Sequence, residues 1–91
     1  VGGGLGAFAN LVQQLRPGWT VKLNEVNLQS IRIARELFDF DVVTSDPQEL
    51  FQSGEQFDVV SSVAVLEHIP DPFGFVESYA RLVKTGGWLV T

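Results

Sequence analysis

The stretch FDVVSSVAVLEHIPDP, residues Phe57–Pro72, decides the fold class of this chain. It opens with a β-branched run that has no strict alternation of apolar and polar positions, which suits a strand buried on both faces of a parallel sheet. Pro70 and Pro72 stand two positions apart, so this end of the stretch cannot lie inside a helix. Asp71 before Pro72 is a cap followed by a proline at the first helical position. The stretch therefore predicts a strand, a loop and a helix in succession.

The residues after this stretch complete a strand–helix–strand unit. Apolar residues recur at helical spacing and line one face of the expected helix, at Phe73, Val76, Ala80 and Val83. The pair Gly86–Gly87 is expected to end this helix, and WLVT, residues 88–91, to begin another strand.

The residues before the stretch also alternate between helices and strands. The expected elements are a helix with the apolar face Leu5, Phe8, Val12 and Leu15, a strand over Trp19–Glu25, a helix over Leu28–Phe38 capped by Asn27, a strand over Phe40–Asp46, and a short helix from Pro47 to Gly54. Such alternation is typical of an α/β domain with a parallel sheet. The residues interpreted as core or sheet-covering rather than as an aromatic cage are Phe8, Phe38, Phe40, Phe51, Phe57 and Val76.

Composition narrows the class of protein further. The chain has 91 residues, enough for one small domain, and its 11 acidic and 6 basic residues give a net charge of -5. An acidic chain with scattered bases speaks against a nucleic-acid partner. There is no cysteine, so thiolate metal sites are excluded, and no apolar run approaches the roughly 18 residues of a membrane span. We expect a soluble, cytoplasmic domain and, since methionine is absent, an internal piece of a longer protein.

The chain opens on a second informative stretch, VGGGLGAF, in which Gly2, Gly4 and Gly6 alternate before a helix. Glycines at a helix start expose backbone N–H groups to a ligand, and the helix dipole favours negative charge there. Glu25 ends the next strand, 19 residues after Gly6, where a carboxylate can accept hydrogen bonds from both hydroxyls of a ribose. This arrangement predicts a nucleoside-cofactor site. The spacing suits S-adenosylmethionine, the dinucleotide pattern that ends at Ala7 fits as well, and a tight turn without a ligand is the third interpretation.

The segments Phe57–Pro72 and LVKTGGWLVT, together with the glycine loop, closely resemble class I S-adenosylmethionine-dependent methyltransferases. In that family the fourth strand typically reads F-D-x-V, an L-E-H-[IV]-x-D-P loop follows, and L-K-P-G-G precedes the fifth strand. Thr85 stands here in place of the usual proline. The LEHIPDP form is most similar to the group that includes ubiquinone-pathway O-methyltransferases. The resemblance implies a Rossmann-like, doubly wound parallel sheet in three αβα layers, with residues 1–91 as one partial cofactor-binding domain.

One departure from the family pattern lies ahead of Val1. The family usually has an acidic residue two positions before the first loop glycine, and this residue touches the methionine part of the cofactor. It belongs to a first strand at the centre of the sheet, and later strands shape the substrate pocket. We expect these parts to lie outside residues 1–91, so that the fold here is incomplete at both ends.

The resemblance implies roles for the residues at the start of the chain. Gly2, Gly4 and Gly6 would form the loop under the methionine and ribose of S-adenosylmethionine. Glu25 would bind the ribose diol, and its alternative is an exposed acid at a strand end. Val26, next to it, would lie against the adenine.

Further cofactor contacts are implied after the third and fourth strands of the family. Asp46 would accept a bond from the adenine amine, although Asp46 is equally a good N-cap for the helix at Pro47. Pro47 would wall the adenine face. Ser62, Ala64 and Val65 lie where the carboxyl end of a strand faces the ligand crevice of an open α/β sheet. Ser62 and Val65 are the cofactor-binding candidates among them.

Glu67 and His68 are the candidates for catalysis. His68 is the only histidine, and imidazole is the usual general base near neutral pH. If the methyl acceptor is a hydroxyl, its proton must leave as the methyl arrives, and His68 would take it. The alternative is a loop histidine that holds EHIPDP in shape. Asp71 is interpreted only as a helix cap.

Three functions remain open on the sequence alone. The first is a methyltransferase that acts on a small molecule, with a hydroxyl as the expected acceptor. The second is the cofactor-binding half of a nicotinamide-dependent oxidoreductase, which the glycine spacing and Glu25 allow. The third is a non-catalytic remnant.

Overall fold

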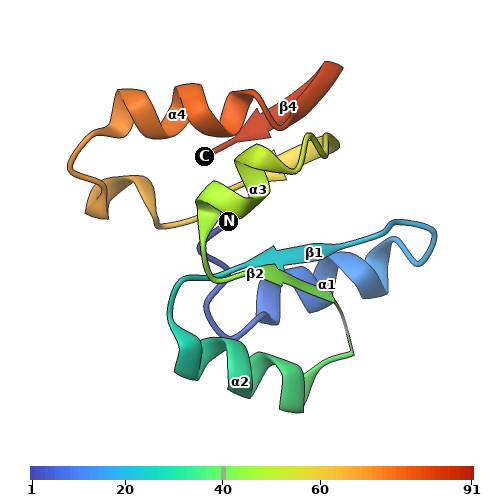
Figure 1. Cartoon of the computed structure of the whole chain (residues 1–91). Coiled ribbons are helices and arrows are strands. Elements are labelled where there is room, and N and C mark those ends of the chain that lie inside the picture. The colour runs from blue at the N-terminus through green and yellow to red at the C-terminus, as the bar shows by residue number, and fades with distance from the viewer. Residues whose placement is uncertain (40) are drawn as a thin grey trace. The chain divides into compact units, whose positions relative to one another are not determined.

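The computed structural model describes residues 1–39 and 41–91, and for residues 41–44 it describes the backbone alone. The described chain divides into two compact units. The N-terminal unit is Gly2–Pro47, and the C-terminal unit is Gln48–Thr91 together with Val1. Figure 1 labels the helices and strands of both.

The N-terminal unit is built around one strand–helix–strand crossover. Helix α1 spans Ala7–Leu15, and it is followed by β1 (Lys22–Asn24), α2 (Leu28–Leu37) and β2 (Asp41–Thr44). The strands β1 and β2 pair in parallel, and their register shifts by one residue before Asn24 meets Thr44. Two parallel neighbours joined through a helix form the βαβ unit that the alternating pattern predicts.

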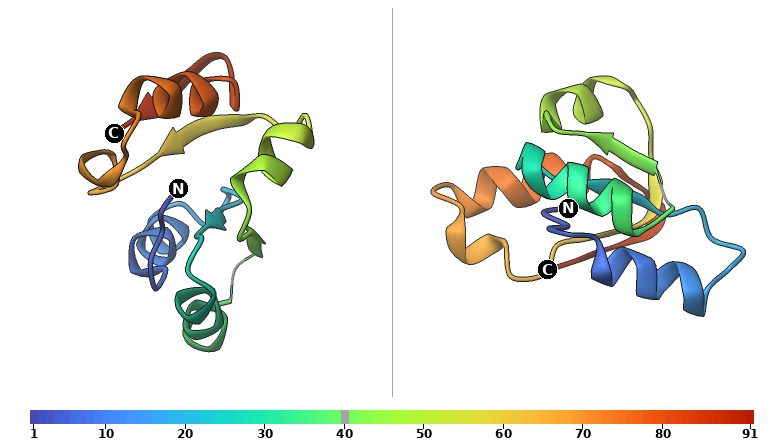
Figure 2. Two further views of the ribbon diagram at one scale, coloured as in Figure 1. Left: turned by 60° about the vertical axis from the view of Figure 1, so that its left-hand side comes forward. Right: turned by 90° about the horizontal axis from the view of Figure 1, so that it is seen from below.

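The C-terminal unit repeats this plan. Its elements are α3 (Pro47–Gln52, which starts at the unit boundary), β3 (Phe57–Ser61), the short 3-10 helix η1 (Leu66–His68), α4 (Pro72–Ala80) and β4 (Val83–Val90). The strands β3 and β4 pair in parallel in a sheet of their own. Figure 2 shows the long loop, with η1 in it, that carries the chain from the end of β3 to α4. The α/β class and the parallel pairing are confirmed, as two two-stranded sheets.

Two of the predicted helix caps are confirmed, one in each unit. The Asn27 side-chain oxygen accepts the Ser30 N–H at 3.0 Å and opens α2. The Asp71 carboxylate accepts the Gly74 N–H at 3.0 Å and opens α4. Each bond satisfies one of the backbone donors that a helix start leaves without a partner.

Each unit has a small apolar core of its own. In the N-terminal unit Ala9, Leu23 and Ala34 are buried together, with Val21 packed against them. Helix α1 therefore contacts the core through Ala9. The predicted apolar face of this helix is wrong, because most of its residues are exposed. Phe8 is 53% exposed, and Leu5 and Leu15 are exposed as well.

The core of the C-terminal unit is organised around Tyr79. Its ring meets Phe51 edge-on at 5.0 Å between centroids and Phe75 at 4.4 Å. Tyr79 is 5% exposed, and burial raises the pKa of its hydroxyl above the ordinary 10.0. Of the residues expected in the core, Phe38, Phe51 and Phe57 are half-buried, Val76 is exposed, and Phe40 lies outside the described residues.

Three strands are shorter than the sequence predicts, and one of them is β2, which ends at Thr44 and not at the predicted Asp46. The expected strand Trp19–Glu25 contracts to β1, Lys22–Asn24. The run that begins at Phe57 leaves the sheet after Ser61. Val59 in that run is 40% exposed, so the prediction of burial on both faces is also wrong. Along β3, Phe57 and Ser61 are half-buried, Asp58 and Val59 are exposed and only Val60 is buried, so neither face of the strand is buried throughout.

The expected helix stop at Gly86–Gly87 is wrong. Helix α4 ends at Ala80, and β4 runs through both glycines. Phe57 pairs with Val83 but Val59 pairs with Trp88, so β4 bulges between these positions. A Cβ on Gly87 would lie 2.6 Å from the Asp58 carbonyl oxygen. This glycine therefore permits a close approach of two strands.

Candidate functional site

The glycine loop adopts the backbone conformation that its alternation predicts. Gly2, Gly4 and Gly6 have φ angles of 59°, 54° and 89°, which lie in the left-handed region that favours glycine. Gly6 is the N-cap of α1, and its carbonyl accepts the Asn10 N–H at 2.9 Å. A side chain added at Gly4 would meet no atom within 4 Å. The loop thus presents bare backbone toward open space.

Gly3 anchors this loop to β1, and the sequence analysis missed it. Its N–H donates to the Asn24 carbonyl at 3.1 Å. The place of its missing Cβ is filled by the Leu23 side chain, which belongs to the buried core. The signal in the sequence was the fourth glycine outside the alternation.

Glu25 is the most constrained of the predicted site residues. It is 8% exposed. One carboxylate oxygen accepts the Gly4 N–H at 2.7 Å, and the other accepts the Asn27 N–H at 2.9 Å. An ionised carboxylate has about four acceptor positions, so two remain for a ligand. The structure brings Glu25 onto the glycine loop, and the alternative of an exposed acid is wrong.

The other predicted residues of this unit lie at the same edge of its sheet. Val26 follows Glu25 and is 64% exposed. Asp46, which follows β2, is exposed, and Pro47 beside it is half-buried. Because β1 and β2 are parallel neighbours, their carboxyl ends meet at one edge. The glycine loop, the buried acid and these three residues therefore gather around the carboxyl ends of the two strands.

Ser62 lies at the carboxyl end of β3 in the C-terminal unit. Its N–H donates to the Val90 carbonyl at 2.9 Å. The residue is 4% exposed, and among the described residues its hydroxyl has no hydrogen-bond partner. Burying a hydroxyl without a hydrogen-bond partner is energetically unfavourable, so a ligand that bonds to it would relieve this cost. Beside it, the Val1 amino nitrogen donates to the Ser61 carbonyl at 2.7 Å.

The loop after Ser62 is unusual in its backbone. Ala64 has a φ of 55°, a conformation that costs a residue with a side chain roughly 1–2 kcal/mol. Val65 is half-buried and precedes η1. Strain of this kind is commonly found at functional sites.

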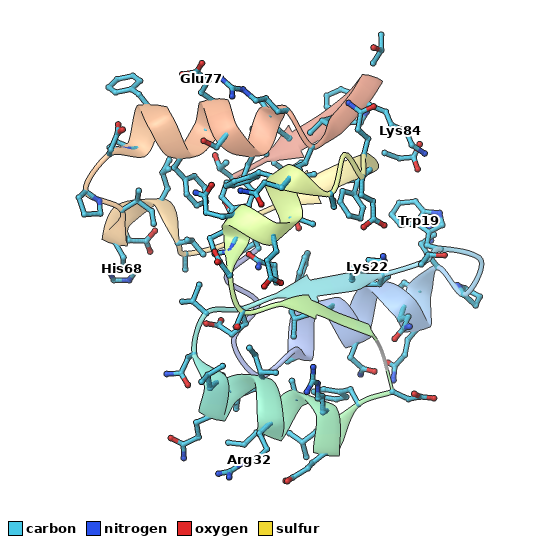
Figure 3. The ribbon with its side chains drawn as sticks, viewed as in Figure 1. Trp19, Lys22, Arg32, His68, Glu77 and Lys84 are labelled. Carbon is cyan, nitrogen blue, oxygen red and sulfur yellow. The ribbon has the colours of Figure 1, made fainter. Side chains whose placement is uncertain are left out.

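Glu67 and His68 form most of η1, and both are exposed. The His68 N–H donates to the Val65 carbonyl at 2.9 Å, so the backbone of this residue already shapes the loop. Its imidazole stands on the outer side of the loop (Figure 3). The structure thus leaves this side chain exposed.

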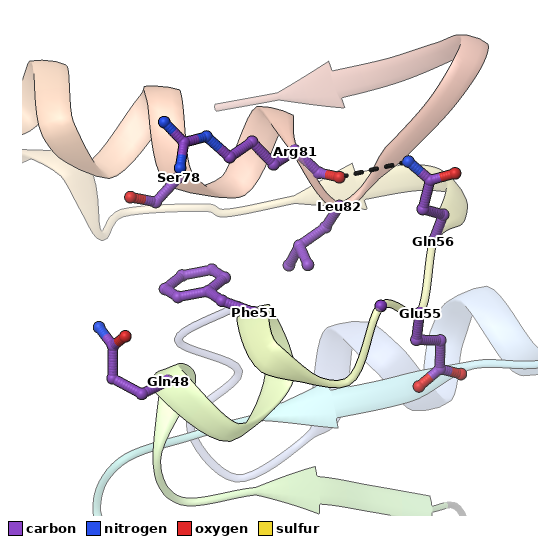
Figure 4. A pocket seen from close by; sticks show the side chains of 8 residues that line it. Gln48, Phe51, Glu55, Gln56, Ser78, Arg81 and Leu82 are labelled. Atoms are coloured by element: carbon purple, nitrogen blue, oxygen red, sulfur yellow. Dashed lines mark hydrogen bonds between the residues drawn. The ribbon is translucent and has the colours of Figure 1, made fainter.

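A hollow of about 310 Å³ lies in the C-terminal unit. Figure 4 shows it between α3 and the end of α4, where the Gln56 side chain donates to the Arg81 carbonyl at 3.4 Å. It is lined by Gln48, Phe51, Gly54, Glu55, Gln56, Ser78, Arg81 and Leu82. The predicted site residues do not contribute to it.

Across the described residues no helix is long and apolar enough to cross a membrane.

Comparisons with known proteins show which family this chain resembles. The family model described as a methyltransferase domain matches residues 1–91. The ubiquinone biosynthesis O-methyltransferase of Thiobacillus denitrificans is 35% identical over 79 residues, which cover 79% of this chain and 34% of that protein. The protein of the same name from Paracidovorax citrulli is 36% identical over an alignment 97 positions long, gaps included, which covers 98% of this chain and 40% of that protein. No solved structure matches the chain significantly.

These matches confirm the resemblance to class I methyltransferases that the sequence motifs predict. They give no support to the oxidoreductase alternative. The chain spans well under half of the length of the curated relatives named above.

Proposed function

Because the chain belongs to the methyltransferase domain family, we propose that it is the cofactor-binding part of an S-adenosylmethionine-dependent methyltransferase. The acceptor we propose is a hydroxyl on a small molecule, in keeping with the O-methyltransferase names of its relatives. The observation that carries the proposal is the contact between buried Glu25 and the backbone of Gly4. It joins a diol-binding carboxylate to a loop of bare N–H groups at the end of a parallel strand.

The residues at this edge suit the parts of the cofactor. Glu25 keeps two acceptor positions for the ribose hydroxyls beside its two backbone bonds. The loop glycines leave room for the ribose and methionine to lie directly on the backbone. For the adenine we propose Val26, Asp46 and Pro47. From the C-terminal unit we propose Ser62, whose buried hydroxyl would gain a partner, and Val65.

The cofactor supplies a methyl group that its sulfonium makes electrophilic, so no covalent enzyme intermediate is needed. The task of the chain is to hold donor and acceptor in line, which can account for a large part of the rate enhancement. As the new C–O bond forms, the acceptor hydroxyl loses its proton. We assign this proton to the exposed imidazole of His68, with Glu67 in the same turn helping to position the acceptor.

The two βαβ crossovers support a finer proposal about the fold. We propose that residues 1–91 are part of a single doubly wound, three-layer αβα domain. Both strand pairs are parallel and each is joined through a helix, which is the building plan of such sheets. A crystal structure of the longer protein would test it.

Glu25→Ala tests the site by calorimetric titration with S-adenosylhomocysteine. Loss of the charged hydrogen bonds is expected to weaken binding by about 1–3 kcal/mol, roughly 5- to 150-fold. The control is Glu36→Ala, since Glu36 is exposed on α2 and its removal leaves the site intact. A dissociation constant that Glu25→Ala leaves at the wild-type value would remove Glu25 from the site.

A further inference from the structure

We infer that Glu25 also fixes the glycine loop in its binding shape before any cofactor arrives, and so acts as a positioning residue for the cofactor. The inference rests on the proposed function for the identity of the ligand. The loop contacts themselves belong to the ligand-free chain.

The carboxylate of Glu25 works as a two-armed clamp. One oxygen takes the Gly4 N–H at 2.7 Å, across 21 positions of sequence, and the other takes the Asn27 N–H at 2.9 Å. Hydrogen bonds to an ionised acceptor are shorter and stronger than neutral ones. Burial of Glu25 removes most of the water that would compete for these donors.

The bonds of Gly3 to Asn24 and of Gly6 to Gly3 hold the loop at two points, and the clamp adds a third hold to a segment that is costly to order. Glycine loses more conformational freedom on ordering than any other residue, and four of the first six residues are glycines. Gly4 has no side chain, and the space beside it is open. Its N–H bond to Glu25 therefore adds a side-chain hold at this position, inside the turn that the Gly6 N–H closes on the Gly3 carbonyl.

The second arm ties the loop to a folded helix end. Asn27 donates its N–H to Glu25, and its side-chain oxygen accepts the Ser30 N–H as the N-cap of α2. The clamp thus joins the glycine loop to the first turn of α2 through one carboxylate. A ribose that takes the two remaining acceptor positions would add to these bonds and leave them in place.

An amide cannot replace this carboxylate. Glutamine has the same shape, but its NH2 group would face one of the two backbone N–H donors. We therefore expect Glu25→Gln to release at least one arm of the clamp while the fold is kept. The matched control is Glu36→Gln on the exposed face of α2.

Amide hydrogen exchange of the ligand-free protein, followed by NMR, tests the inference. In Glu25→Gln the amide of Gly4 or Asn27 is expected to exchange about tenfold faster or more than in the wild type. The Asn10 amide, bonded to Gly6 at 2.9 Å, serves as the folding reference, and Glu36→Gln is expected to change neither clamp amide. Unchanged exchange at both Gly4 and Asn27 in folded Glu25→Gln overturns the inference.

The wild-type protein gives an independent test if the variant does not fold. Gly4, held by Glu25, is expected to be protected from exchange at least tenfold more than Gly2 in the same loop. Equal exchange at the two glycines overturns the clamp. Neither exchange measurement contains a cofactor, so both remain readable if the methyltransferase proposal fails.

A kinetic measurement separates positioning from simple stabilisation. In Glu25→Gln the KM for S-adenosylmethionine is expected to rise about tenfold or more, with kcat within about twofold of the wild type. Faster exchange of the Gly4 amide beside an unchanged KM would show a structural clamp without a positioning role, and would overturn the inference as stated.

Discussion

The two units of this chain carry their functional residues in opposite ways. In the N-terminal unit Glu25 is buried and bonded through both oxygens to backbone N–H groups. In the C-terminal unit Glu67 and His68 belong to the most specific motif of the sequence, yet both are exposed on a short 3-10 turn. The difference teaches that a distinctive motif and a preassembled site need not coincide. The proposed cofactor contacts lie on the bonded backbone of one unit, whereas the candidate acid–base residues lie on an exposed loop of the other.

The largest effect is expected in the C-terminal unit, at the exposed His68. If His68 takes the acceptor proton, His68→Ala lowers turnover roughly 10²–10⁴-fold, while the affinity for S-adenosylhomocysteine stays within about twofold. Release of S-adenosylhomocysteine with a panel of phenols and alcohols as acceptors measures the rate.

His68→Gln separates proton transfer from loop shaping. Glutamine keeps a hydrogen-bonding side chain but cannot take a proton near neutral pH. We expect it to be as inactive as His68→Ala. Recovery of wild-type turnover in His68→Gln would leave His68 as a residue that shapes the loop.

A smaller effect is expected in the N-terminal unit, where the adjacent glycines Gly3 and Gly4 have different surroundings. Gly3→Ala drives a methyl group into the buried Leu23 side chain, and such overpacking costs about 1–3 kcal/mol of folding free energy. Gly4→Ala meets open space and is destabilised only by its φ of 54°, which costs roughly 1–2 kcal/mol.

Urea unfolding of both glycine variants measures this difference directly. Titration with S-adenosylhomocysteine should reverse the order, because the new methyl group of Gly4→Ala enters the space proposed for the ligand. A Gly4→Ala variant that is less stable than Gly3→Ala would show that the loop is not anchored through Gly3.

The smallest effect concerns the C-terminal unit alone, since Tyr79 is the only tyrosine of the chain. Burial raises the pKa of its hydroxyl above 10.0, so the folded state keeps the proton at a pH where the unfolded state has lost it. The stability from this residue is therefore full below pH 10.0 and falls as the pH rises through the folded pKa.

Urea unfolding between about pH 9 and pH 11 checks this prediction, with Tyr79→Phe as the matched control. The variant should lose less stability over this range than the wild type. Parallel pH profiles for the two proteins would contradict the assignment.

The sequence predicts those features that depend on interactions between residues close together in the chain. The caps at Asn27 and Asp71 were predicted because a side chain bonds a backbone donor only three residues away. The left-handed glycines of the loop follow in the same way from their own lack of a side chain. The α/β class follows from the alternation of short segments.

The features that sequence reasoning missed depend on partners far along the chain. The local sequence predicts a helix stop at Gly87, whereas in the structure only a glycine fits there beside the Asp58 carbonyl of the neighbouring strand. Ala9 makes the core contact of α1 because it meets Leu23 of β1. The clamp from Glu25 to Gly4 spans 21 positions. Such contacts form only when distant segments come together in the fold, so no local sequence pattern predicts them.

Calorimetric titration of the protein with S-adenosylhomocysteine, with NAD as the parallel ligand, tests most directly whether the glycine loop and Glu25 bind a methyl donor. S-adenosylhomocysteine has the ribose, adenine and amino-acid parts of the cofactor but no methyl group to transfer. The account predicts binding of one S-adenosylhomocysteine and no binding of NAD. Binding of NAD alone, or of neither ligand by protein that circular dichroism shows to be folded, would contradict it.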